Sequence, residues 1–189
     1  MDIEAIEQDL SERLSKKRFT HTLGVVEAAR ALARIYGVNE EDAHIAALLH
    51  DCGKELSLQD MQLLVQDIPC DDEMFANGAL LHGLAGMVLA QSRYGVTKQD
   101  VLEAIRVHTT GKPNMSELDK IIFLADYIEK NRDFPGVDFI REAANKSLNE
   151  GVLAGYDMTI RHLLDKGLSI YVLTILGRND ILQHMRGGN

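Results

Sequence analysis

Six side chains able to ligate a metal ion stand within otherwise apolar stretches of this chain. They are His21, His50, Asp51, His82, His108 and Asp126. Burying one neutral polar group without a partner costs about 1–3 kcal/mol, and an unpaired charge costs far more. A single histidine on an apolar helix face is more often a hydrogen-bonded core residue than a ligand. Six such positions together, with His50 and Asp51 adjacent, indicate that one or two divalent metal ions bind among them.

Asp126 is the position hardest to explain as ordinary core, because it stands in the apolar segment IIFLADYI. A carboxylate there is either paired with a cation or protonated at a cost. Mixed imidazole and carboxylate ligands suit Fe, Mn, Zn, Co or Ni better than Ca or Mg. Two histidines and two aspartates make one site with open positions, and two further histidines would complete a second. Such sites lower the pKa of a bound water and neutralise charge on a phosphoryl oxygen.

Three cationic residues lie close in sequence to these candidate ligands. Lys54 follows the His-Asp pair, Arg18 precedes the first histidine by one helical turn, and Arg132 comes just after the last aspartate. Surface solvation explains each of them equally well when taken alone. Around a metal they would bind phosphate oxygens, arginine in bidentate fashion and lysine as a point charge. Thr109 offers a hydroxyl beside His108, although the same segment is also typical of a plain helix C-terminus.

The other candidates are expected to lie outside the site. Asp119 and Glu129 have the pattern of solvated charges on a helix. We interpret His44, His162 and His184 as structural or surface residues, because their surroundings are polar or terminal.

The elements that must position these residues are helices, because the hydrophobic period along the chain is 3.6 residues rather than 2. Asn39, Ser57 and Ser116 are typical helix N-caps, and Gly and Pro residues separate the apolar segments. We expect helices at about 20–36, 39–52, 57–66, 77–94, 97–109 and 116–131, and two or three more from 138 to 184. The tail HMRGGN is expected to fray. The predicted fold is all-α, a compact single-domain helical bundle over residues 1–189.

Composition excludes several classes of partner. The net charge is −9 and no Lys/Arg-rich stripe is present, so nucleic acid is a poor candidate and a small anionic substrate a better one. Apolar runs fall short of the ~18 residues that a membrane span requires. Cys52 and Cys70 have no paired metal spacing, and the acidic start differs from a secretory leader. We therefore expect a cytoplasmic protein without disulfides or membrane contact.

Five segments together resemble one known family. They are RFTHTLGVVEAA, AALLHDCGKEL, LLHGLAG, IRVHTTG and LADYIEKNRDFPGV, within residues 18–137. Their order of histidines and aspartates resembles the HD-domain metal-dependent phosphohydrolase superfamily. Within it the segments are similar to the YqeK-type branch, whose members are symmetrical diadenosine-tetraphosphate hydrolases. The resemblance implies that diadenosine tetraphosphate is split into two ADP molecules, with residues 138–184 completing the core and lining the nucleotide pocket.

The same resemblance implies roles for individual residues. Iron, in one or two ions, would be held by His21, His50, Asp51 and Asp126, and Asp51 and Lys54 would serve catalysis. His82 and His108 would either complete a second metal site or contact substrate phosphates. Lys54 and Arg132 match family motif positions and would contact the substrate. Independently of the resemblance, we also expect substrate contacts from Arg18, Gly83, Thr109 and Tyr171. Tyr171 would stack on the base, although core packing is the more common role for such a residue.

Other functions fit parts of the pattern. A nucleotidase or nucleoside-triphosphate hydrolase of the same superfamily would differ in its products. A guanosine-tetraphosphate hydrolase is less favoured, because those domains usually come with synthetase and regulatory regions that this length excludes. A nucleotide-sensing protein would bind metal and nucleotide without turnover, and a plain structural bundle would bind no metal. An exposed apolar face on a terminal helix would support a homodimer.

Overall fold

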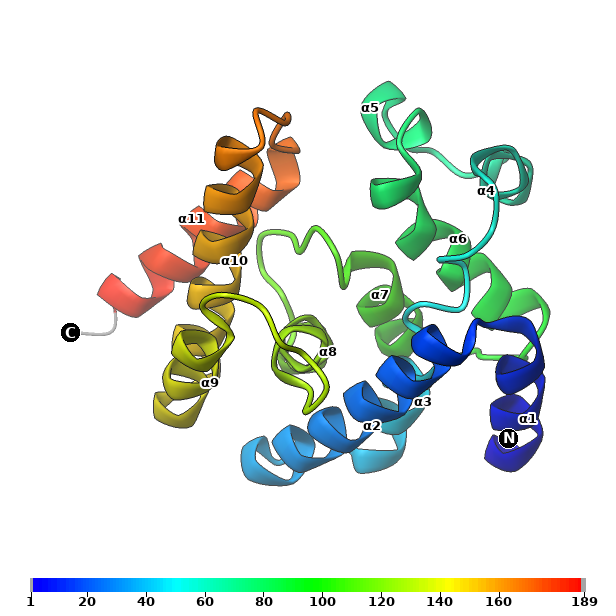
Figure 1. Ribbon diagram of the computed structural model, residues 1–189, viewed down its shortest axis with the longest axis horizontal. Coiled ribbons are helices and arrows are strands. Elements are labelled where there is room, and N and C mark those ends of the chain that lie inside the picture. Colours follow the sequence, from blue (N-terminus) through cyan, green and yellow to red (C-terminus); the bar gives the residue numbers. More distant parts are fainter. Residues whose placement is uncertain (1, 188–189) are drawn as a thin grey trace.

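The computed structural model describes residues 2–187, and within them every regular element is an α-helix (Figure 1). The helices are α1 (Ile3–Arg13), α2 (Lys16–Tyr36), α3 (Glu40–Leu49), α4 (Leu58–Val65), α5 (Asp72–Phe75), α6 (Gly78–Ser92), α7 (Gln99–Val107), α8 (Glu117–Ile128), α9 (Val137–Lys146), α10 (Leu148–Asp165) and α11 (Val172–Gly187). The prediction of an all-α fold is confirmed. None of these helices has the length and apolar character needed to cross a bilayer.

The predicted helix starts follow from side-chain caps. Asn39, Ser57 and Ser116 each accept a hydrogen bond from the backbone N–H three residues further on. Such a cap satisfies a donor that the first helical turn leaves unpaired. At Ser116 the contact is reciprocal, because the side chain of Asp119 accepts from the backbone N–H of Ser116 in a capping box.

Several boundaries differ from the sequence-based expectation. Helix α2 begins at Lys16 rather than near Thr20, because Ser15 caps it. The short helix α5 was not predicted, and α8 ends at Ile128, so residues 129–132 form a turn instead of helix. Helix α11 continues to Gly187, so the expected fraying from His184 is wrong for residues 184–187; residues 188–189 lie outside the described part.

Helix α8 occupies the centre of the fold (Figure 1), between α9 and α10 on one side and α2, α3 and α7 on the other. Five consecutive residues of α8, from Ile121 to Ala125, are buried. A helix that is apolar on all sides is typical of a central position. A second, smaller core joins α4, α5 and α6 to Tyr171, which lies just before α11.

Two glycines allow the histidine-bearing segments to approach closely. A Cβ at Gly83 in α6 would lie 2.5 Å from the carbonyl oxygen of Arg106 in α7. A Cβ at Gly53, after α3, would lie 3.0 Å from both the backbone N of Gly86 and the carbonyl oxygen of His82. Because these neighbours are backbone atoms, larger residues at Gly53 or Gly83 would push apart the segments that carry four of the candidate ligands, His50, Asp51, His82 and His108.

Candidate metal centre

The structure brings all six predicted ligands into one buried cluster. They come from five elements: His21 from α2, His50 and Asp51 from the end of α3 and its following turn, His82 from α6, His108 from the end of α7, and Asp126 from α8. All except Asp126 are less than a tenth exposed. Residues more than a hundred positions apart in sequence therefore surround one point.

Asp51 lies at the centre of the cluster. Its Oδ2 atom is 3.4 Å from His50 Nε2 and 3.8 Å from His21 Nε2. Its Oδ1 atom is 3.4 Å from His82 Nε2 and 3.5 Å from His108 Nε2. The two oxygens thus face different histidine pairs, an arrangement that suits a carboxylate shared between two adjacent ligand groups.

Each of the two ligand groups has its own donor atoms. In the first, donor atoms of His21, His50 and Asp126 lie within 4.8 Å of one another, with His21 Nε2 3.0 Å from Asp126 Oδ1. In the second, donor atoms of His50, Asp51 and His108 also lie within 4.8 Å of one another. The four residues predicted as ligands therefore lie together, divided over two groups that share His50, and His108 lies beside Asp51 in the second.

The hydrogen bonds around the histidines fit a bound divalent cation. His50 Nδ1 donates to the carbonyl of Ala47 at 2.6 Å, and His108 Nδ1 donates to the carbonyl of Ile105 at 2.7 Å. These bonds leave the Nε2 lone pairs directed at the cluster, the usual arrangement in metal-binding histidines. His21 Nε2 and His50 Nε2 are buried and have no hydrogen-bond partner within the described chain. A proton or a metal ion between these nitrogens and the facing carboxylate oxygens would remove the repulsion between their lone pairs.

The electrostatics of the cluster follow from burial and close opposite charges. Burial alone would raise the pKa of Asp51, but the charge and hydrogen bonds of His50 and His108 hold it well below its usual range. Burial also disfavours the charged form of His50, yet Asp51 outweighs this effect and raises the pKa of His50. A metal ion bound at this cluster would compete with a proton for His50, so its affinity would fall at acidic pH. Burial, with the nearby positive charge of Lys54, lowers the pKa of His82 to about 4.

The predicted cations all lie against ligand residues. Arg18 Nη1 is 2.6 Å from Asp51 Oδ2. Arg132 donates from Nε to the backbone carbonyl of Asp126 at 2.7 Å and from Nη2 to its carboxylate. Lys54 Nζ is 3.3 Å from a ring nitrogen of His82, and burial lowers the pKa of this lysine. Positive charge thus surrounds the anionic ligands.

Of the other residues predicted to contact substrate, Thr109 lies beside the cluster, whereas Tyr171 and Gly83 are buried in packing contacts. Thr109 Oγ1 lies 2.9 Å from His82 Nε2, at the edge of the cluster. Tyr171 lines a cavity of about 370 Å³ together with Thr109, but its ring is buried in the smaller core and its hydroxyl donates to Asp71. Gly83 is buried against the backbone of α7, so the structure shows a packing contact for it.

Two expectations about charged residues are wrong. Asp119 is 1% exposed because it closes the capping box of α8 and lies 3.5 Å from Lys112. Glu129 is 2% exposed because it accepts a hydrogen bond from His21 Nδ1 at 3.1 Å. The Ser116-x-x-Asp119 spacing is typical of a capping box, and it could have predicted the burial of Asp119. Glu129 stands three residues after Asp126, just beyond the last residue of α8, and no local pattern marks its burial. His44, His162 and His184 lie outside the cluster, as expected.

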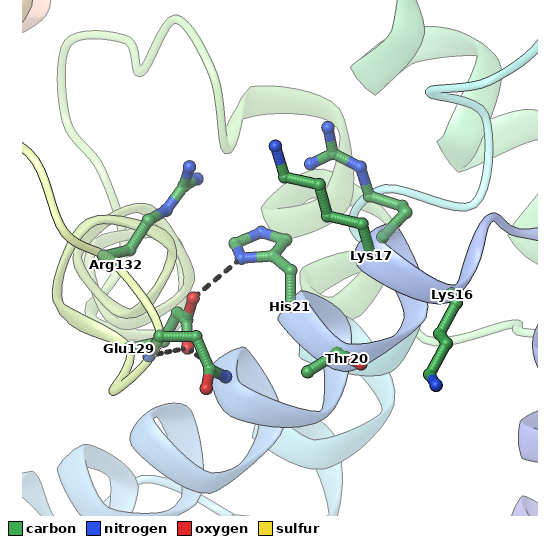
Figure 2. Close-up of a pocket in the computed structure, with 8 residues that line it drawn as sticks. Lys16, Lys17, Thr20, His21, Glu129 and Arg132 are labelled. Carbon is green, nitrogen blue, oxygen red and sulfur yellow. Dashed lines mark hydrogen bonds and ion pairs between the residues drawn. The ribbon is translucent and has the colours of Figure 1, made fainter.

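A second cavity, of about 620 Å³, opens beside His21. Its lining includes four cations, of which the sequence had not singled out Lys16 and Lys17. Figure 2 shows Lys17 extending from α2 and Arg132 from the segment after α8 toward the space beside His21. This cation-lined cavity is lined by His21 itself, whereas the cavity at Thr109 reaches the cluster through the contact of Thr109 with His82.

Comparison with known proteins identifies the family to which the chain belongs. The HD domain family model matches residues 18–131. The chain is 42% identical over 176 residues to a "Bis(5'-nucleosyl)-tetraphosphatase, symmetrical" from Halalkalibacterium halodurans, covering 93% of this chain and 94% of that one. It is 36% identical to a protein of the same name from Bacillus subtilis, covering 90% and 92%.

A solved structure shows the same fold. The crystal structure of a "predicted HD superfamily hydrolase involved in NAD metabolism" from Clostridium acetobutylicum matches with a TM-score of 0.94 and 43% identity, covering 97% of this chain and 98% of that one. The family model spans every residue of the cluster. With its five-element histidine and aspartate centre, this chain belongs to the HD domain family.

Proposed function

We propose that this chain hydrolyses diadenosine tetraphosphate symmetrically, giving two ADP molecules, and that it does so with one or two divalent metal ions, iron by preference. The observation that carries the proposal is the buried cluster of Nε2 atoms and carboxylates, bordered by Arg18, Lys54 and Arg132. Relatives that align over nine-tenths of the chain bear the name of this activity.

The metal, when bound, lowers the pKa of a coordinated water and neutralises charge on the phosphoryl oxygens. His21, His50, Asp51 and Asp126 would hold it, with His108 and His82 completing a second position or contacting phosphate. These residues fit the role because their second ring nitrogens are already engaged, as at His50 and His108.

The cations of the chain account for phosphate binding. Arg18 and Arg132 each pair with a ligand carboxylate and also line the cation-lined cavity, so they lie between the cluster and solvent. Their guanidinium groups can bind phosphate oxygens in bidentate fashion, while Lys54 supplies a point charge beside His82. The leaving ADP departs as an acidic phosphate, so the reaction needs little general-acid assistance.

The two cavities offer room for the two halves of the substrate. The cavity at Thr109 combines the apolar side chains of Leu80, Leu163 and Leu168 with the polar Ser169, a lining suited to a nucleoside. The cation-lined cavity suits the phosphates of the other half. Cleavage at the middle of a tetraphosphate follows when the central anhydride lies across the cluster between the two cavities.

The test is incubation of the metal-loaded chain with diadenosine tetraphosphate and chromatography of the products, beside Asp51→Asn. The isosteric substitution preserves volume, and circular dichroism checks that the variant is folded. ADP as the sole product, absent with Asp51→Asn, supports the proposal. ATP plus AMP contradicts the cleavage position, and hydrolysis of mononucleotides instead indicates a nucleotidase. Binding without turnover indicates a sensor.

A further inference from the structure

Glu129 is a buried carboxylate next to the metal centre that the proposed chemistry does not use. It follows the last residue of α8 and is only 2% exposed. Its Oε1 atom lies 3.1 Å from His21 Nδ1. Its Oε2 atom accepts hydrogen bonds from the backbone N–H of Asn131 at 2.7 Å and from the side-chain amide of Asn131 at 2.9 Å. Each oxygen therefore has a separate partner, and Figure 2 shows the carboxylate beside the imidazole of His21.

The surrounding chain holds this carboxylate in place. The backbone N–H of Glu129 donates to the carbonyl of Ala125, and its carbonyl accepts from the guanidinium of Arg141 at 3.0 Å. Arg141 also donates to the carbonyl of Arg132, so one side chain of α9 ties both ends of the turn together. A side chain at Gly24 in α2 would place its Cβ 2.2 Å from Glu129 Oε2, so the glycine provides the space that the carboxylate occupies.

We propose that Glu129 is a positioning residue for the metal centre, acting through His21. An ionised carboxylate can only accept a hydrogen bond, so His21 Nδ1 must donate to it. The proton then resides on Nδ1, and the lone pair of Nε2 faces Asp126 and Asp51, at 3.0 and 3.8 Å. This contact selects the tautomer that can ligate a cation and fixes the orientation of the ring. The inference rests on the metal centre of the proposed function.

The geometry explains why glutamine cannot replace Glu129. Asn131 presents two donors to Oε2, and His21 Nδ1–H requires an acceptor at Oε1. Glutamine has one oxygen and one amide nitrogen. If its oxygen faces Asn131, its NH₂ group faces His21 Nδ1, which then favours the tautomer with a proton on Nε2. If its oxygen faces His21, donors oppose donors at Asn131.

The test compares Glu129→Gln with Asp119→Asn, a matched control that also removes one buried carboxylate from an end of α8. Asp119 bonds to Ser116 and approaches Lys112, and neither residue belongs to the cluster. The metal-free full chain is titrated with Co²⁺, and the visible absorption bands report the affinity and the ligand set. Thermal unfolding of the metal-free chain reports stability.

The expected result is a 10- to 100-fold weaker Co²⁺ affinity and altered absorption bands for Glu129→Gln, the usual effect of losing a group that orients a ligand. Asp119→Asn should lower the unfolding temperature and leave the affinity within about twofold. Native affinity and bands in Glu129→Gln would overturn the inference, as would an equal loss of affinity in Asp119→Asn.

A second variant keeps the test decisive if Glu129→Gln does not fold. Asn131→Ala removes one donor from Oε2 at an exposed position, and it should weaken Co²⁺ affinity by a smaller factor, about 3- to 10-fold. An unchanged affinity would count against the inference. Absence of Co²⁺ binding in the native chain would instead overturn the metal centre itself, so the two failures are distinguishable.

Discussion

The close contact between α6 and α7 should limit both stability and activity, and Gly83→Ala tests it. His82 lies on α6 and His108 directly follows α7, and the Nε2 atoms of the two histidines lie 3.1 Å apart. A Cβ at position 83 would lie 2.5 Å from the carbonyl oxygen of Arg106, while ordinary contact begins near 3.4 Å. Because the obstructing atom is backbone, no side chain can rotate away, and the two helices must separate.

The size of the effect follows from the overlap. Overpacking a buried contact costs about 1–3 kcal/mol, and alanine recovers up to about 1 kcal/mol over glycine in a helix. A net loss of about 1–2 kcal/mol should lower the unfolding temperature of a chain of this size by about 2–8 °C. A displacement approaching 1 Å at reacting groups can cost about 100-fold in rate, so kcat/KM should fall 10- to 100-fold.

The assay pairs thermal unfolding with the rate of ADP formation, and Gly78→Ala is the matched control. Gly78 begins the same helix, and the nearest atoms to a Cβ there, from Leu58 and Met61, are 3.9 Å away. We expect the control to retain its activity and to be at least as stable as the native chain. Unchanged activity in Gly83→Ala, or an equal loss in Gly78→Ala, would refute the reasoning.

Three other predictions concern metal, pH and phosphate binding. Removal of metal with a chelator should abolish hydrolysis and lower the unfolding temperature, and Fe²⁺ added without oxygen should restore both; a rate that survives chelation contradicts the metal centre. Hydrogen bonds from Arg106 and Lys112 lower the pKa of Glu103 from 4.5 to about 2, so its contribution to stability is present above pH 4.5 and lost as the pH falls toward 2. Glu103→Gln should therefore reduce the unfolding free energy by about 1 kcal/mol at pH 7, allowing for partial solvent exposure, and by somewhat less than half as much near pH 3, as denaturant titration at both values would show. Lys17→Ala should raise KM for diadenosine tetraphosphate several-fold with little change in kcat, because Lys17 lines the cation-lined cavity; equal KM values would exclude it from substrate binding.

The sequence was informative about the ligands because residue type alone separates them from their surroundings. Asp126 is conspicuous in IIFLADYI, and the five residues that precede it in α8 are buried. The helix starts were equally accessible, since a cap such as Ser116 acts within three residues of its own position. Local patterns of this kind require no knowledge of where the rest of the chain lies.

Glu129 shows why the remainder of the site could not be read from the sequence. Its charge and its place after a helix are those of a solvated residue, and the helix pattern does not reveal that α8 ends at Ile128. Burial of Glu129 depends on a partner 108 positions earlier, His21, and on the space left by Gly24 one turn beyond it. Gly24 is not unusual in its own helix, and the pattern that marks His21 as a candidate ligand does not reveal which residue contacts its Nδ1. The role of the carboxylate arises only from the packing of α2 against α8, so tertiary structure, rather than any local signal, converts this surface-type residue into part of a metal centre.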